Sequence, residues 1–137
     1  MSREPVKDTQ AMIRGMSPVL DPVPYHFCTS QAGATDPGLL AQALASFVEE
    51  EGLSLILTDA LARAHGFATD MPMQRITLNV YSALDGVGLT AAVAVALAEH
   101  DIPCNMVAGY HHDHAFVPAA QADQALEVLL RLAGPAA

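Results

Sequence analysis

The stretch that decides the fold runs from Arg75 to Pro118, RITLNVYSALDGVGLTAAVAVALAEHDIPCNMVAGYHHDHAFVP. Residues 75–81 alternate between apolar and polar side chains, which predicts a strand with one face toward a core. A glycine turn at 85–88 then opens a segment that is apolar almost all round and ends near His100, which predicts a helix buried on more than one side. Residues 102–110 and 115–119 read as strands joined by a tight connection, and an amphipathic helix beginning at Gln121 or Asp123 follows.

The first half of the chain has a weaker version of the same order. A helix is expected from residue 8 or 9 to Met16, an extended connector over 17–24, and a strand over 25–29. Residues 37–50 fit either one helix or a helix that ends near Ala43. The second alternative adds strands at 45–48 and 53–58, joined by a turn at Glu49–Gly52, and a short helix capped by Asp59 follows. We favour the second alternative because it repeats the order of the second half, and residues 44–50 stay open between helix and strand.

Together the two halves predict an α+β protein built from two ferredoxin-like βαββα repeats, with antiparallel sheets covered by helices on one face. The repeats divide the chain into a first subdomain at 8–68, which includes the N-terminal helix, and a second at 73–133.

The composition excludes several classes of function. A net charge of −9 without a run of lysine or arginine argues against binding to nucleic acid or to an anionic membrane. No apolar stretch reaches the length of about 20 residues that a membrane span requires, and the N-terminus does not resemble a signal peptide. Cys28 and Cys104 lie in apolar segments, and we expect buried free thiols in the cytoplasm.

Two motifs in the second half resemble those of ACT domains. One is the Asp85–Thr90 loop (DGVGLT) that opens the apolar helix, and the other is the Ile-Pro-Cys-Asn sequence at 102–105. With EEGLSLIL at 50–57, RITLN at 75–79 and VAGY at 107–110, the chain is similar to small stand-alone bacterial proteins with two ACT domains in tandem. Their arrangement resembles the paired ACT domains of aspartate kinases and arginine sensors. Val87 departs from the family pattern, in which proline is common at this place, so the loop is less rigid.

The same loop is our candidate ligand site. Free N–H groups at a helix start, beside glycines that allow close approach, suit the carboxylate of a small ligand. Gly88 would allow that approach, the backbone of Leu89 and Thr90 would donate, and Asp85 could receive an ammonium group or simply cap the helix. The expected site comprises Asp85, Gly86, Val87, Gly88, Leu89 and Thr90, with Asn105 reaching a ligand across a paired interface. The structural alternative is an ordinary strand-to-helix turn.

The resemblance implies a non-catalytic sensor or regulator that binds an amino acid or a similar small ligand and would act on an enzyme in trans. The alanine-rich helix and the exposed sheet edges favour a homodimer. No cofactor is expected. One alternative is a protein-interaction module without a ligand. Another is a metal-binding protein or enzyme that uses the His111–His114 connection, in which His112 and His114 would be half of a zinc site.

Overall fold

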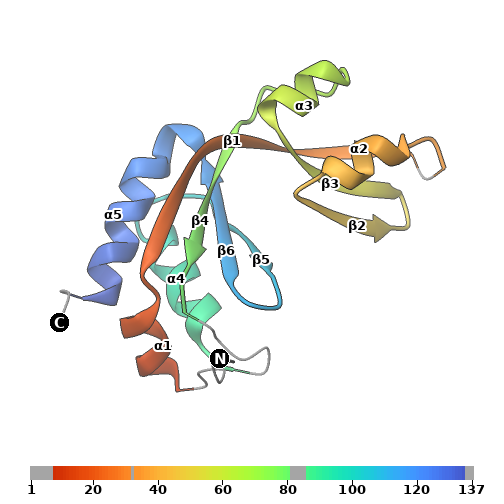
Figure 1. Cartoon of the computed structure of the whole chain (residues 1–137). Helices are drawn as coiled ribbons and strands as arrows, with labels where there is room; N and C mark the ends of the chain where they lie inside the picture. The colour runs from red at the N-terminus through yellow and green to blue at the C-terminus, as the bar shows by residue number, and fades with distance from the viewer. Residues whose placement is uncertain (1–7, 32, 81–85, 135–137) are drawn as a thin grey trace. The chain divides into compact units, whose positions relative to one another are not determined.

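The computed structural model describes residues 8–31, 33–80 and 86–134. Its elements in chain order are α1 (Thr9–Gly15), β1 (Pro18–Ser30), α2 (Pro37–Gln42), β2 (Ala45–Glu49), β3 (Gly52–Thr58), α3 (Asp59–Ala64), β4 (Met73–Leu78), α4 (Leu89–Ala98), β5 (Asn105–Ala108), β6 (Asp113–Pro118) and α5 (Ala122–Ala133), with a short 3-10 turn at Ala119–Gln121 before α5 (Figure 1). The strands follow the order β2-β3-β1-β4-β6-β5, and the pairs β1–β3, β2–β3 and β5–β6 are antiparallel. The expected α+β, ferredoxin-like architecture is confirmed.

Residues 44–50, for which the sequence allows either helix or strand, contain strand β2 in the structure. Ala43 leaves the helical conformation at the end of α2, and β2 follows it directly. Gly52 lies opposite Glu49 at the turn and has φ +152°, and a Cβ there would lie 2.7 Å from the backbone oxygen of Ser30. The glycine is therefore needed where the hairpin passes close to β1.

By its contacts the chain forms two compact units, which share β1 between them. Unit 1 combines residues 1–22 with 74–137, and unit 2 consists of residues 23–73. The expected division at 8–68 and 73–133 follows the sequence repeat instead, and it stays a prediction of where the two repeats lie.

Unit 1 contains β4, β5, β6, α4 and α5, together with α1 and the first residues of β1. That part of β1 is joined to β4, since Gln74 donates to the backbone oxygen of Asp21 (3.1 Å) and Arg75 pairs with the Asp21 carboxylate (3.1 Å). Helix α1 packs against both α4 and α5. The core of the unit is formed by these buried residues: Met12, Met16, Ile76, Leu78, Val80, Leu89, Val93, Leu97, Ile102, Ala115, Val117, Ala122, Ala125, Val128 and Leu129.

Unit 2 has a smaller core on the helix-covered face of its strands. It is formed by Cys28 of β1, Leu55 and Leu57 of β3, Leu39 of α2 and Ala62 of α3. The N-cap of α3 differs from the expected one, because Thr58 accepts from the amide of Leu61 at 3.2 Å while Asp59 is the first helical residue.

Two other expectations about element bounds were wrong. The three prolines at 18–24 lie inside β1, because proline favours the extended backbone that a strand requires. Strand β5 begins at Asn105 because the chain first closes α4: Asp101 has φ +56° and the amide of Ile102 donates to Leu97 O at 3.0 Å. This six-to-one bond is the Schellman arrangement, and it uses the amide of Ile102 before a strand can begin.

Candidate functional site

The turn before α4 is built around Gly88. This residue is the N-cap of the helix, has φ +106°, and its carbonyl accepts the first helical bond from Ala92 at 2.9 Å. Leu89 is buried in the core of unit 1 and anchors the turn, whereas Val87 and Thr90 are exposed. Asp85, the other expected member of this loop, lies outside the described residues.

The first turn of α4 differs from those of the helices before it. Asp8, Asp36 and Thr58 cap α1, α2 and α3 with side-chain oxygens, but Gly88 offers α4 no side-chain cap. The N–H groups of the first turn of a helix have no intrahelical partner, and the helix dipole favours negative charge there. The start of α4 can therefore accept an anionic group from outside the helix.

Thr9 fills the space that the hydrogen side chain of Gly88 leaves. A Cβ built on Gly88 would lie 2.6 Å from Cγ2 and 3.0 Å from Oγ1 of Thr9. The Thr9 hydroxyl also donates to the carbonyl of Val87. The close approach that the glycine permits is thus made by α1 of the same unit, and the contact fixes the direction in which the loop enters α4.

The structure does not bring Asn105 together with this turn. The chain leaves β4 at one end of the sheet, and the ten residues of α4 carry it back along the sheet by about 15 Å. Strand β5 therefore begins with Asn105 at the opposite end from Gly88 (Figure 1). Asn105 is exposed to solvent.

Sequence reasoning missed the counterpart of this turn in the first repeat. Thr35-Asp36-Pro37-Gly38 stands between β1 and α2, where the repeat places Asp85–Gly88 in the second half. The Asp36 carboxylate accepts from the amide of Gly38 at 3.0 Å, and Pro37 occupies the first helical turn. An aspartate-proline-glycine sequence before an apolar pair was the available signal. Because Asp36 already satisfies the start of α2, this turn is less open to an anion than the start of α4.

The side chains of the His111–His114 connection do not form a metal site with any others that the structure describes. His112 lies between the strands and His114 lies in β6, where its Nδ1 is 3.0 Å from the Thr77 hydroxyl of β4. Burial, and after it the nearby charge of Arg75, lowers the pKa of His114. Within residues 8–31, 33–80 and 86–134, no three histidine, cysteine, aspartate or glutamate side chains lie close enough together to hold a metal ion. The metal alternative thus lacks a third ligand in the described part of the chain.

Unit 2 holds a buried histidine that sequence reasoning did not single out. His26 of β1 is 2% exposed, and its Nε2 lies 2.7 Å from Oδ1 of Asp59 at the start of α3. The other carboxylate oxygen of Asp59 accepts from Arg63 at 2.8 Å. The hydrogen bonds from Arg63 and from His26 lower the pKa of Asp59. This arrangement ties β1 to α3, and the Cys28 thiol donates to the backbone oxygen of His26 at 3.6 Å rather than to its ring.

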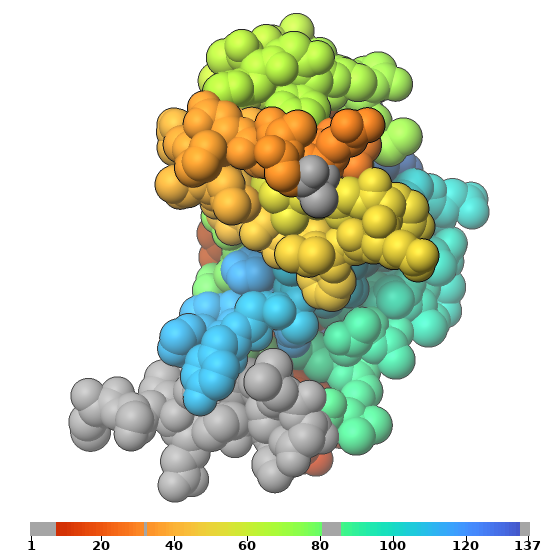
Figure 2. Space-filling model, turned by 90° about the vertical axis from the view of Figure 1, so that its right-hand side faces the viewer, coloured from red at the N-terminus to blue at the C-terminus, as the bar shows by residue number. Residues whose placement is uncertain are grey.

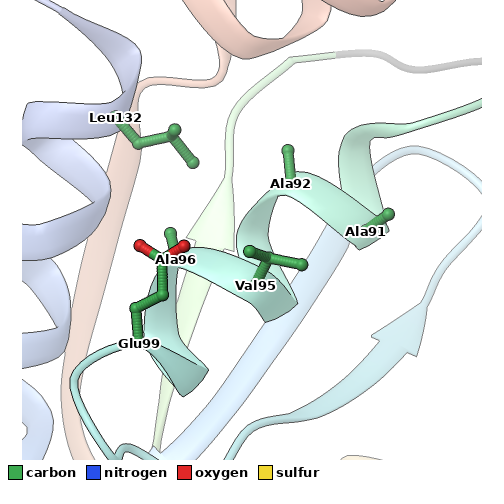
Figure 3. Close-up of a pocket in the computed structure, with 6 residues that line it drawn as sticks. All are labelled: Ala91, Ala92, Val95, Ala96, Glu99 and Leu132. Carbon is green, nitrogen blue, oxygen red and sulfur yellow. The ribbon is translucent and has the colours of Figure 1, made fainter.

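Helix α4 is less buried than its composition predicts. Leu89, Val93 and Leu97 form one buried stripe, but Val95 is 55% exposed. The exposed side forms a shallow apolar hollow with the end of α5, in which Leu132 lies opposite Ala92 and Ala96, and Glu99 closes one end (Figure 3). The expectation that the helix is buried on more than one side was therefore wrong within this chain.

Both cysteines are free: Cys28 is buried and Cys104 half-buried, and burial raises the pKa of each thiol. Among the residues that the structure describes, no helix is both long and apolar enough to cross a membrane.

Comparison with known families matches two ACT-domain models to the chain, one over residues 4–74 and the other over residues 74–131. A crystal structure of a Vibrio cholerae protein of unknown function, described as a possible transport protein, is 41% identical. The match covers 90% of this chain and 94% of that protein, with a TM-score of 0.79. No curated protein matches the sequence at the threshold applied.

Two more distant structures share the fold alone. The ligand-free regulatory subunit of aspartate kinase from Thermus thermophilus is 10% identical over 86% of this chain and 97% of its own, with a TM-score of 0.62. An Agrobacterium tumefaciens protein is 16% identical over 80% of this chain and 83% of its own, also with a TM-score of 0.62.

Proposed function

This chain belongs to the ACT-domain family and carries two ACT domains in tandem, and on that premise we propose that it is a non-catalytic sensor that binds an amino acid. ACT domains are regulatory, ligand-binding modules, so the coarse role follows from the family. The observation that carries the proposal further is the start of α4, which has no side-chain cap of its own. An amino acid supplies the carboxylate that such a helix start favours.

In this proposal the backbone of Gly86–Thr90 holds the ligand carboxylate. Thr9 supports the loop from the side of α1, so that the N–H groups of Leu89 and Thr90 keep their direction. Asn105 lies at the other end of the sheet, and it would contact a ligand bound to the helix start of a different ACT unit. The ligand would act by binding one arrangement of the units more tightly than another, since only differential affinity shifts a conformational equilibrium.

We further propose that the protein forms a homodimer and regulates a separate enzyme. The regulatory subunits of aspartate kinase share the fold of this chain. By analogy with them, we propose that it regulates a separate enzyme. The cytoplasmic location stays a prediction.

A thermal-shift screen of the full chain against the twenty amino acids tests the ligand proposal. A ligand at about 100 times its dissociation constant adds about 2.7 kcal/mol to the free energy of unfolding, which is a clear rise in melting temperature. We expect such a rise for one amino acid or a chemically related group of them. No rise with any amino acid would contradict the proposal.

A pair of variants at Thr90 locates the site. Thr90→Glu places a negative charge at the start of α4, which should oppose a ligand carboxylate while the helix dipole keeps the helix itself stable. Thr90→Gln has nearly the same size without the charge, and Thr90 is exposed, so both variants should fold. We expect the ligand-induced rise to be lost in Thr90→Glu and kept in Thr90→Gln. A rise that survives in both would place the ligand elsewhere.

A further inference from the structure

Polar side chains line one face of the unit 1 part of the sheet, which we call the helix-free face because α4 and α5 cover the other one (Figure 1). The strand residues that point into the core with these helices are Ile76 and Leu78 of β4 and Ala115 and Val117 of β6. Side chains alternate between the two faces of a strand, so Arg75, Thr77 and His114 lie on the helix-free face. All three are half-buried, and Figure 2 shows the neighbouring β5–β6 connection, in light blue, at the surface that faces the viewer.

Contacts on both sides hold the His114 ring in place. Its Nδ1 lies 3.0 Å from the hydroxyl of Thr77 on the adjacent strand. Its Nε2 lies beside Gly109, where an added Cβ would be 3.5 Å away. The amide of Gly109 donates to the carbonyl of His112 at 2.9 Å and closes the connection between β5 and β6. In the described part of the chain Nε2 forms no hydrogen bond, so it can bond to a ligand.

The charges near His114 give its surroundings a positive field, although the chain has a net charge of −9. Burial lowers the pKa of His114 most, the charges of Arg75 and His112 lower it further, and Asp113 opposes them with the smallest effect. Asp21 of β1 pairs with Arg75 at 3.1 Å, and β5 adds no titratable side chain. Salt screens charges that are farther away than about 8 Å, so the local positive charges decide which ligand is attracted.

Protonation of His114 increases the number of hydrogen-bond donors on this face. The imidazolium carries N–H groups at both nitrogens, so Nδ1 then donates to the Thr77 oxygen. The hydroxyl hydrogen of Thr77 is thereby released, and it can donate to a ligand together with Nε2 and the Arg75 guanidinium. A negatively charged ligand with several acceptor oxygens would satisfy these donors, and it would favour the protonated ring.

A phosphate group fits these donors better than a carboxylate does. Arginine binds both groups through charge-assisted hydrogen bonds, but the donors here come from side chains on two strands. A tetrahedral phosphate presents its oxygens in several directions, whereas the oxygens of a carboxylate lie in one plane. A phosphate monoester also carries a charge of about −1.5 to −2 at pH 7, which is more than the single charge of a carboxylate.

We propose that Arg75, Thr77, His112 and His114 form a site on the helix-free face of unit 1 that binds a phosphate group. The amino-acid site of the proposed function lies at the start of α4, on the helix-covered side of the same unit, so the two sites are separate. The phosphate site goes beyond that function. The thermal-shift screen with amino acids and the phosphate titration are independent readouts, and either proposal can fail without the other.

Titration of the full chain with inorganic phosphate, followed through the NMR signals of the histidine rings, tests the site. Sodium chloride keeps the ionic strength constant during the titration. We expect saturable shifts at His112 and His114 and a rise in the pKa of His114, because a bound anion stabilises the imidazolium. His65 and His100 are exposed and lie on other elements, so they are internal controls. No shift at His114, or equal shifts at all of these histidines, would overturn the proposal.

Substitutions in the site supply a second test. Arg75→Gln should weaken phosphate binding at least about tenfold, which is typical for the loss of a hydrogen bond between charged groups. Arg131→Gln changes the net charge equally at a 71% exposed side chain of α5, and it should bind phosphate like the native chain. Thr77→Val keeps the charge of the site and the pair of Arg75 with Asp21, and it should weaken binding about three- to tenfold. Native affinity in both Arg75→Gln and Thr77→Val would refute the site.

Acetate and glycerol 3-phosphate, titrated in the same way, test the class of ligand. Phosphate should bind at least about tenfold more tightly than acetate, because it carries more charge and more acceptor oxygens. Equal affinities for phosphate and acetate would overturn the assignment to a phosphate group. Tighter binding of glycerol 3-phosphate than of inorganic phosphate would identify a phosphate ester as the ligand, and weaker binding would identify free phosphate.

Discussion

Gly88→Ala would strain the turn before α4 and push against α1 at the same time. A non-glycine residue at a φ such as +106° costs about 1–3 kcal/mol. The new Cβ would lie 2.6 Å from Cγ2 of Thr9, and overlap of this kind in a packed region costs about 1–3 kcal/mol more. We expect the free energy of unfolding to decrease by about 2–6 kcal/mol.

Thr9→Ala should remove the steric overlap with residue 88, which is one of the two causes of the destabilisation by Gly88→Ala. The substitution removes the hydroxyl that donates to Val87, at a cost of about 0.5–1.5 kcal/mol. It also removes Cγ2 and Oγ1, and the remaining Cβ of residue 9 lies 3.4 Å from the Cβ position of residue 88, which is close to ordinary contact. In the Thr9→Ala background, Gly88→Ala should therefore cost only the backbone strain. The double variant should be more stable than the sum of the single effects predicts, by about 1–3 kcal/mol.

Urea denaturation of the native chain, both single variants and the double variant measures this coupling. Gly66→Ala is the matched control, since Gly66 has φ +75° but no atom within 4 Å of its Cβ position. Gly66→Ala should decrease the free energy of unfolding through backbone strain alone. Its effect should add to that of Thr9→Ala in the double variant. If Gly88→Ala costs the same in both backgrounds within about 0.5 kcal/mol, the contact between α1 and the loop is not what the glycine accommodates.

Three further outcomes follow from contacts in each unit. Gly52→Ala should destabilise more than the Gly66 control in urea, because its Cβ would meet a backbone oxygen at 2.7 Å that cannot rotate away; equal costs would contradict this. Asp59 has a folded pKa below its usual value near 3.8, so its contribution is present above that pH and is lost as the pH falls through the lower native pKa. Asp59→Asn should therefore lose less stability on acidification in urea titrations than the native chain, and parallel acid profiles would argue otherwise. Arg75→Gln should raise the pKa of His114 by removing one positive charge, while burial still holds it below 6.5; NMR titration of the ring protons measures this, and an unchanged midpoint would refute it.

The repeat was the most informative feature of the sequence. Periodicity alone favoured a helix through Phe47 and Val48, because their spacing from Leu44 fits a helical face. Comparison with the second half indicated a hairpin at the same place, and β2 and β3 confirm it. Local propensity is a weak guide where strand pairing with a distant partner decides the outcome, as it does here through β1.

The candidate site was harder to predict than the fold, because the residues that shape it are far apart in the chain. Nothing near Gly88 indicates that Thr9, 78 residues away from Val87, would fill the space beside it. Likewise, the apolar sequence of α4 predicts burial on more than one side. The composition of a helix does not reveal how many of its faces have packing neighbours. The position of Asn105 depended on the direction of the crossover, which the ferredoxin-like order already implies. That placement could have been derived from the sequence.

The shared strand β1 has a consequence for synthesis of the protein on the ribosome. Residues 23–73 are continuous and can form unit 2 early, but α1 packs against α4 and α5, which come after unit 2 in the sequence. Met12 and Met16, 1% and 0% exposed in the folded protein, must wait for α5. At about 5–20 residues per second that interval lasts several seconds or more. Until α5 is made, the α1 segment has no complete core to pack against, so its apolar side chains stay exposed in the nascent chain, and a chain that stops after unit 2 would keep them exposed.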